Sequence, residues 1–216
     1  MRGFTISDFY TMLSGLQWTA ILVAVALFFG APLALVIARM CTSRNPLARL
    51  AATGLLQVVQ GVPVLGLLVF FYFGMPVFLG IKVPALVSVG VAYTIFTAAF
   101  LGEIWRGGIQ SVHVAQSEAG ACLGLTGWQT FRHVVAPQAF RTSLPATIGF
   151  VVQLIKNTSL ASIVGFVELS RTGQLASAAT FKPLLCYALV AAIYFIVCFP
   201  LTQWSRSLEV KLNGAR

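Results

Sequence analysis

The stretch LQWTAILVAVALFFGAPLALVIA, residues 16–38, decides the class of fold. It contains no charged residue, and its one proline is Pro32. A helix of about 20 apolar residues crosses the roughly 30 Å hydrocarbon layer of a bilayer. The run is also longer than the apolar part of a secretory signal. We therefore expect it to remain in the protein as a membrane-spanning helix.

Four further apolar runs follow. They cover about residues 50–73, 83–102, 142–167 and 183–204, and Lys156 is the one charge within them. Of the 216 residues, 58% are hydrophobic and 9% are charged, whereas a soluble domain carries roughly 25% charged residues. Because lipid cannot satisfy exposed backbone groups, these runs are predicted to be helices. The sequence thus predicts one all-α membrane domain, 1–216, with five transmembrane helices, and a short interfacial helix within residues 1–15.

The basic residues predict the orientation. Nine of them follow the first, third and fifth runs: Arg39, Arg44, Arg49, Arg106, Arg132, Arg141, Arg206, Lys211 and Arg216. Four lie on the other side: Arg2, Lys82, Arg171 and Lys182. Loops rich in Lys and Arg stay in the cytoplasm. We therefore expect the N-terminus outside and the C-terminus in the cytoplasm, and we attribute the net charge of +9 to orientation rather than to nucleic-acid binding.

Metal binding and covalent catalysis find little support in the sequence. The four cysteines are Cys41, Cys122, Cys186 and Cys198, with no CxxC spacing, and His113 has no second ligand nearby in the sequence. Lys156 and Ser159 are the one base-and-nucleophile pair at membrane depth, and no third group orients them. We expect no metal site, no disulfide framework and no catalytic residue.

Residues 103–141 form the least apolar stretch, which the charge distribution places in the cytoplasm. Short helices are predicted at about 117–123 and 127–135, the second ending at Pro137. Gly124 between them is suited to a left-handed helix end. With Ala119 and Gly120 on its surface, such a loop would let a partner approach closely. The alternative is an ordinary connecting loop.

Within this loop, Glu118-Ala119-Gly120 followed by Gly124 resembles the Glu-Ala-Ala-x-x-x-Gly motif of ABC importer permeases. Three further stretches are similar to the polar amino acid uptake branch of that family: 60–63 (QGVP), 103–111 (EIWRGGIQS) and 156–160 (KNTSL). The four motifs occur in order. Gly120, Gln60 and Ala136 depart from the usual Ala, Arg and Leu of the family.

The resemblance implies a type I importer permease with several partners. Two permease subunits, identical or homologous, would pair in a bacterial inner membrane. Each would dock its loop, through Glu118, Ala119, Gly120, Gly124 and Arg132, onto a dimer of cytoplasmic ATP-binding subunits. A periplasmic or extracellular binding protein would deliver the amino acid. This sequence has no P-loop, so ATP and Mg²⁺ are expected in the partner ATPase, and no cofactor in this chain.

Lys156 is expected about 21 Å into the fourth span. An unpaired ammonium at that depth needs a watery cavity or a partner. It either favours the carboxylate of the cargo or is a structural, snorkelling lysine. The following Asn157, Thr158 and Ser159 could offer hydrogen bonds to a zwitterion, and the neutral Asn157 disfavours arginine or lysine as cargo.

Two further pairs of residues each have two structural interpretations. Gln60 and Pro63 lie in a Gly-x-Pro context that predicts a helix kink, either beside the translocation path or merely in the packing. Glu103 and Arg106 share a helix face; they form either a local ion pair or a gate that shifts between inward and outward states.

The competing functional hypothesis is a self-contained secondary transporter or channel for small polar solutes. Such proteins often contain internal repeats, and none is visible here. The sequence does not specify which amino acid is carried.

Overall fold

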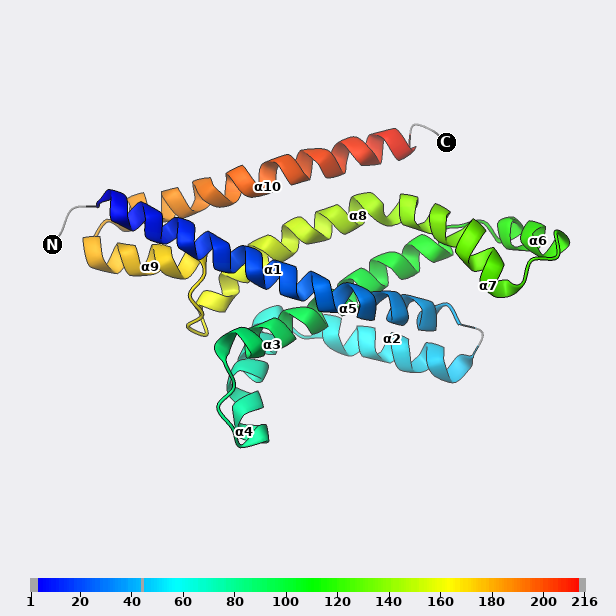
Figure 1. Ribbon diagram of the computed structural model, residues 1–216, viewed down its shortest axis with the longest axis horizontal. Coiled ribbons are helices and arrows are strands. Elements are labelled where there is room, and N and C mark those ends of the chain that lie inside the picture. The colour runs from blue at the N-terminus through cyan, green and yellow to red at the C-terminus, as the bar shows by residue number, and fades with distance from the viewer. Residues whose placement is uncertain (1–3, 44, 214–216) are drawn as a thin grey trace.

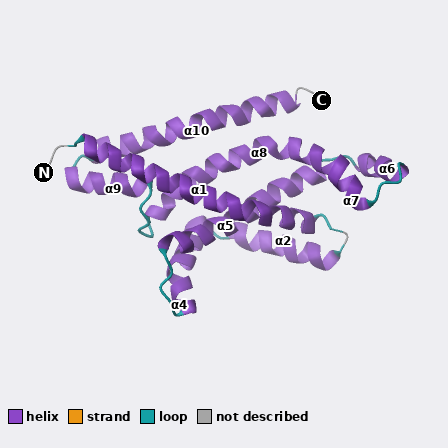
Figure 2. Cartoon of the chain, in the orientation of Figure 1, coloured by secondary structure: helices purple, strands orange, loops and turns teal. Residues whose placement is uncertain are grey.

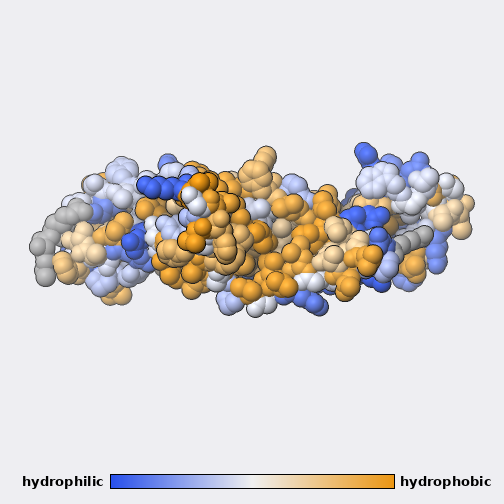
Figure 3. Space-filling model, turned by 90° about the horizontal axis from the view of Figure 1, so that it is seen from below, coloured by the Kyte–Doolittle hydropathy of each residue, from blue (hydrophilic) through white to orange (hydrophobic). Residues whose placement is uncertain are grey.

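The computed structural model describes residues 4–43 and 45–213, and every regular element within these ranges is a helix (Figures 1 and 2). Long helices lie roughly along one axis; the short helices of residues 114–130 lie at one end, and those of residues 64–79 project from the middle (Figure 1). Orange, apolar side chains dominate the middle of the face in Figure 3, while blue, polar side chains gather toward the ends. This distribution matches a protein that crosses a lipid layer.

Helix α1 (Ile6–Cys41) is one continuous helix of 36 residues, about 54 Å long. It begins at a capping box, in which the backbone N–H and the hydroxyl of Thr5 both donate hydrogen bonds to the Asp8 carboxylate at 2.9 Å. The separate interfacial helix predicted within residues 1–15 was wrong, because nothing after this cap interrupts the helix; residues 1–3 lie outside the described residues. At Gly30, a Cβ atom would lie 2.8 Å from Thr97 of helix α5 (Ala85–Gln110), so α1 and α5 approach closely there.

The second predicted span is broken. In its place, residues 46–79 form α2 (Pro46–Gly61), α3 (Val64–Val69), a π-helical turn at Phe70–Gly74, and α4 (Met75–Leu79). The segments before and after Pro63 meet at 95°. A proline disfavours helical geometry in the residue before it, and Val62 is indeed extended, with ψ 131°.

Helix α5 lies at the centre of the fold and packs against α1, α2, α3 and α8 (Ala136–Asn157). Its buried Tyr93 and Phe96 share the main core with Leu22 of α1 and Phe150 of α8. The helix continues beyond the predicted end at residue 102, because polar residues can extend a helix past the lipid.

The cytoplasmic loop contains α6 (Val114–Cys122), α7 (Gly127–Thr130) and a π-helical turn at Phe131–Val135. That turn leads without interruption into α8 (Ala136–Asn157). The predicted helix end at Pro137 was therefore wrong. A proline ring clashes with the carbonyl four residues earlier in a regular helix, and the wider π turn just before Pro137 makes room for it.

The fourth predicted span, 142–167, is wrong at both ends, since α8 begins at Ala136 and ends at Asn157. A 3₁₀ turn, Thr158–Ser162, follows. The hydroxyls of Thr158, Ser159 and Ser162 each bond a carbonyl three residues back at 2.7 Å, which competes with helical bonding. Helices α9 (Leu169–Thr180) and α10 (Pro183–Asn213) complete the chain, and α10 packs against α8 and α9.

Among the described residues, α1, α5 and α10 are long and apolar enough to cross a membrane, and the bent pair α2 with α3–α4 makes a fourth candidate. Helix α8 has 22 residues, about 33 Å. Its first half is more polar, and it packs between α5 and α10. The all-α membrane architecture predicted from the sequence is confirmed.

Candidate functional site: a docking knob and an intramembrane cavity

Residues 114–135, here called the knob, project at the end of the molecule where α5 gives way to α8 (Figure 1). Glu118 and Ala119 are exposed. His113 caps α6, its Nδ1 accepting a hydrogen bond from the Ala115 N–H at 3.2 Å. The motif residues Glu118 and Ala119 are thus free for contact with a partner.

Gly124 ends α6 in the left-handed conformation that the sequence predicts, with φ 75°. The Leu125 N–H donates to the Gly120 carbonyl at 3.0 Å, and the Gly124 N–H donates to the Ala121 carbonyl at 3.0 Å. This pair of bonds is the Schellman arrangement, which requires positive φ at the residue after the cap. Gly124 therefore sets the angle between α6 and α7.

Gly120 does not lie on the surface of the knob, which corrects the prediction. It is buried, and a Cβ atom there would lie 2.8 Å from Cγ2 and 2.9 Å from Oγ1 of Thr130. The two helical arms of the knob touch at this point. The glycine at position 120, where the family usually has alanine, therefore leaves the space that the Thr130 side chain occupies.

Gly120→Ala is expected to loosen the knob by about 1 kcal/mol, since a steric cost of overpacking of about 2 kcal/mol exceeds the gain in helix propensity of about 1 kcal/mol. The rate of hydrogen exchange at the α6 amides measures this loss of stability. The double variant Gly120→Ala, Thr130→Ala is expected to regain protection. If Gly120→Ala alone increases the protection of the α6 amides from exchange, the contact with Thr130 does not limit the stability of the knob.

Helix α1 contacts the knob through Arg39, near the end of the helix. The Arg39 guanidinium lies 4.8 Å from the centre of the Phe131 ring, a distance typical of a cation–π contact. Phe131 in turn stacks on Trp128 of α7, with ring centres 5.9 Å apart. Arg132 and His133 are exposed on the same turn. The Arg39–Phe131 contact could not be predicted from the sequence, because it joins segments far apart in the chain.

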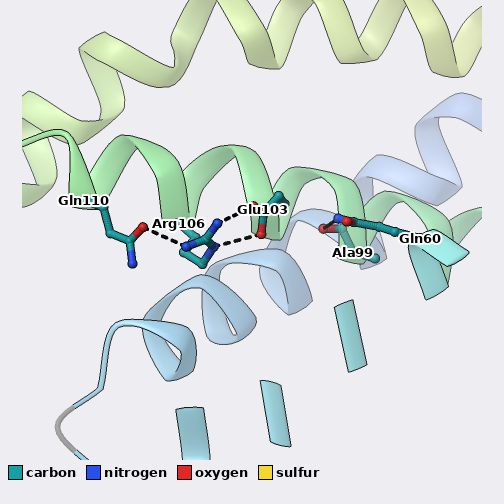
Figure 4. A network of polar contacts seen from close by, with 5 residues as sticks. All are labelled: Gln60, Ala99, Glu103, Arg106 and Gln110. Atoms are coloured by element: carbon teal, nitrogen blue, oxygen red, sulfur yellow. Dashed lines mark hydrogen bonds and ion pairs between the residues drawn. The ribbon is translucent and has the colours of Figure 1, made fainter. Parts of the chain in front are cut away.

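Glu103, Arg106 and Gln110 form a polar ladder on one face of α5 (Figure 4). The Arg106 guanidinium donates to both Glu103 oxygens, through Nε at 2.8 Å and through a second nitrogen in an ion pair. It also donates to Gln110 at 2.7 Å. The structure thus places the two predicted charges in a local ion pair at the knob end of α5.

Gln60 and Pro63 lie at the bend between α2 and α3, and both are exposed. The Gln60 amide donates to the Ala99 carbonyl of α5 at 3.5 Å (Figure 4). Neither residue lines the cavity that contains Lys156. The structure therefore separates this bend from the rest of the predicted substrate path.

A cavity of about 630 Å³ follows one face of α10 and is closed on its other side by α8, the 3₁₀ turn and α9. We call it the α10 cavity. Its polar lining includes Lys156, Ser159, Ser170, Tyr194, Thr202 and Arg206. The lining positions of α10 recur every three or four residues from Tyr187 to Arg206, a length of about 28 Å. Lys156 therefore lies in an elongated cavity that follows α10.

Of the four consecutive residues predicted for the substrate path, Lys156 and Ser159 line the α10 cavity, while Asn157 and Thr158 do not. The Asn157 carbonyl accepts a hydrogen bond from the Tyr93 hydroxyl of α5 at 2.6 Å. Thr158 is fully buried and bonds the Ile155 carbonyl. Asn157 thus ties the end of α8 to α5, and Thr158 lies within the core.

Glu168 is a buried acid that was not predicted from the sequence. Its side chain is 0% exposed and caps α9, accepting hydrogen bonds from the Ser170 and Arg171 N–H groups at 2.9 Å. The Tyr194 hydroxyl of α10 donates to it at 2.9 Å, and the Thr19 hydroxyl of α1 lies at 3.5 Å. The available signal was a single acid directly after an apolar run, since an acid at the start of a helix can accept hydrogen bonds from its first N–H groups.

Glu168→Ala is expected to destabilise the protein by about 3 kcal/mol, because it removes a helix cap and leaves buried donors without an acceptor. Thermal unfolding in detergent measures this as a fall of several degrees in Tm. Glu209→Ala removes an exposed acid of α10 and is the control. Equal melting temperatures for the two variants would contradict the role assigned to Glu168.

The chain is similar to known permeases over most of its length. The family described as binding-protein-dependent transport system inner membrane component matches residues 30–212. The probable amino-acid ABC transporter permease protein YckA of Bacillus subtilis (strain 168) is 32% identical over 206 residues, covering 95% of this chain and 91% of YckA. The glutamine transport system permease protein GlnP of Escherichia coli (strain K12) is 34% identical over 159 residues, covering 73% of each chain.

Solved structures give the same result. The crystal structure of an amino acid ABC transporter with histidines matches with a TM-score of 0.86 at 30% identity, covering 98% of this chain and 100% of that chain. An inward-facing MetNI methionine ABC transporter, 17% identical, shares the fold with a TM-score of 0.74. The chain therefore belongs to the family of binding-protein-dependent transport system inner membrane components and has the fold of the type I ABC importer permeases.

Proposed function

We propose that this chain is the membrane-spanning subunit of an ATP-driven importer for a polar amino acid, which a separate binding protein delivers. The names of YckA and GlnP, permeases for amino acids and for glutamine, support this cargo class. The chain itself is a transport subunit, and its ATP and Mg²⁺ bind to a partner.

The observation that carries the proposal is the knob. Glu118 and Ala119 are exposed on α6, at the tip of the molecule, and the Schellman turn at Gly124 and the Arg39–Phe131 contact fix its shape. A rigid, exposed helix of this kind can pass the movement of an ATP-binding subunit to α8, which is continuous with the knob. Arg132, exposed on the same arm, lies where it could contact that subunit.

The full assembly contains two permease subunits, identical or homologous, on a dimer of ATP-binding subunits in a bacterial inner membrane. The N-terminus faces outward and the knob lies in the cytoplasm, as the distribution of Lys and Arg indicates. The Glu103–Arg106 pair, at the knob end of α5, is placed to respond when the knob moves.

The α10 cavity is the proposed cargo path within this subunit. Lys156 supplies a positive charge in a region where an ammonium is costly unless water or an anion accompanies it. The cargo carboxylate is such an anion. Ser159 provides a hydroxyl on the same wall.

Co-purification tests the docking step. The chain is expressed with the ATP-binding subunit encoded beside it, and the amount of that subunit recovered is compared between wild type and Glu118→Lys. Reversing the charge at an interface is expected to lower recovery on the order of tenfold. Lys182→Glu, exposed beside α9 at the opposite end, is the control and should not change it. Equal recovery from Glu118→Lys and wild type would argue against docking through the knob.

A further inference from the structure

The two charged side chains that line the α10 cavity are both cations. Lys156 projects from α8, and Arg206 lies near the end of α10. Among the described residues that line this cavity, none is Asp or Glu. The charged side chains of the lining therefore carry a net positive charge.

The acid that contacts this wall, Glu168, is buried behind it. Glu168 is 0% exposed, and its carboxylate is occupied by the Ser170 and Arg171 N–H groups and by the Tyr194 hydroxyl. Ser170 and Tyr194 line the cavity in its place, with their oxygens 3.2 Å apart. The lining surface at this point thus consists of hydroxyl groups, and the Glu168 carboxylate lies behind them.

The remaining wall is neutral. Tyr187, Thr202 and Gln203 offer hydrogen bonds, and Val190 and Phe199 offer apolar surface. A volume of about 630 Å³ lies within the roughly 300–1,000 Å³ range of small-molecule sites. Such a site can bind an amino acid through its carboxylate and through a neutral or anionic side chain.

We infer that the α10 cavity selects by charge, so that the cargo is an amino acid with a neutral polar or acidic side chain and not a cationic one. This inference rests on the proposed function. A second positive charge within several ångströms of Lys156 or Arg206 is disfavoured on the order of tenfold at the effective dielectric constant of a protein. No lining carboxylate offsets that repulsion.

Charge-selective labelling tests the field without requiring transport. Thr202 lines the cavity and bonds only the Cys198 carbonyl among the hydrogen bonds found, so Thr202→Cys is mild. Cys41, Cys186 and Cys198 are replaced by alanine, and exposed Cys122 in the knob stays as the reference. The probes are the anionic sulfonatoethyl and the cationic trimethylammonioethyl methanethiosulfonates, applied to the full chain in nanodiscs.

The ratio of anionic to cationic labelling rates is expected to be on the order of tenfold higher at position 202 than at Cys122. Lys156→Met and Arg206→Met should each lower it. Gln203→Cys, on the same wall, repeats the measurement in case one thiol is protected. A ratio equal to that of Cys122, a ratio that neither substitution changes, or two unreactive thiols would overturn the inference.

Uptake separates this inference from the proposed function. In proteoliposomes with the ATP-binding subunit and the binding protein, ATP-dependent uptake of L-glutamine or L-glutamate is expected to exceed that of L-arginine at least tenfold. If L-arginine enters as well as the other two, the charge selection is wrong while the importer function stands. If labelling shows a positive field but nothing enters with ATP, the proposed function is wrong.

Discussion

A Lys156→Met variant of the assembled importer is expected to take up its amino acid with a KM raised at least about tenfold. Methionine keeps most of the length of the side chain and removes the ammonium. A hydrogen bond to a charged group contributes about 1.5–3 kcal/mol, which corresponds to a factor of roughly ten or more in affinity. The measurement is the concentration dependence of ATP-driven uptake in proteoliposomes.

The control separates a cargo contact from a structural role. Gln153→Met makes the same replacement at an exposed position of α8 that does not line the α10 cavity, and it should leave KM unchanged. Lys156→Arg keeps the charge and should recover part of the affinity. If Lys156→Met keeps the wild-type KM, the lysine is structural and the carboxylate contact is excluded.

Gly124→Val is expected to lower recovery of the ATP-binding subunit on the order of tenfold. The φ of 75° at Gly124 is a conformation in which a β-branched residue is strained by about 2 kcal/mol. The chain would relieve that strain by opening the Schellman turn, which changes the angle between α6 and α7. Co-purification of the pair measures the loss, and Tm in detergent shows whether the membrane helices remain intact.

Gly127→Val is the matched control for this variant. A Cβ atom meets nothing within 4 Å at either glycine, but Gly127 does not have positive φ. The two substitutions therefore differ in backbone strain alone. Equal recovery from both variants would mean that the angle set by Gly124 does not matter for docking.

The membrane architecture could be predicted from the sequence because lipid leaves a chain few alternatives. Uncharged runs longer than about 18 residues must be helical to satisfy their backbone. The ends of the helices were harder to predict. Helix α5 continues to Gln110 through polar residues, and α8 stops at Asn157 because hydroxyl side chains bond the backbone of an apolar segment.

The candidate site was partly predictable. Lys156 and Glu118 stand out as a charge at membrane depth and as a motif residue in a polar loop. The lining contributed by α10 could not be predicted, because that helix is apolar almost all round and its sequence does not show which face turns toward α8. The contact between Gly120 and Thr130, and the burial of Glu168 between α1, α9 and α10, likewise depend on tertiary packing.

Uptake by purified components tests the central claim most directly. The chain is reconstituted in liposomes with its ATP-binding subunit, a second permease subunit if the complex contains one, and the binding protein loaded with radiolabelled L-glutamine or L-glutamate. The account predicts accumulation that requires ATP, the binding protein and the ATP-binding subunit together, and that Glu118→Lys abolishes. Accumulation by this chain alone, without ATP, would contradict it and would favour a self-contained transporter or channel.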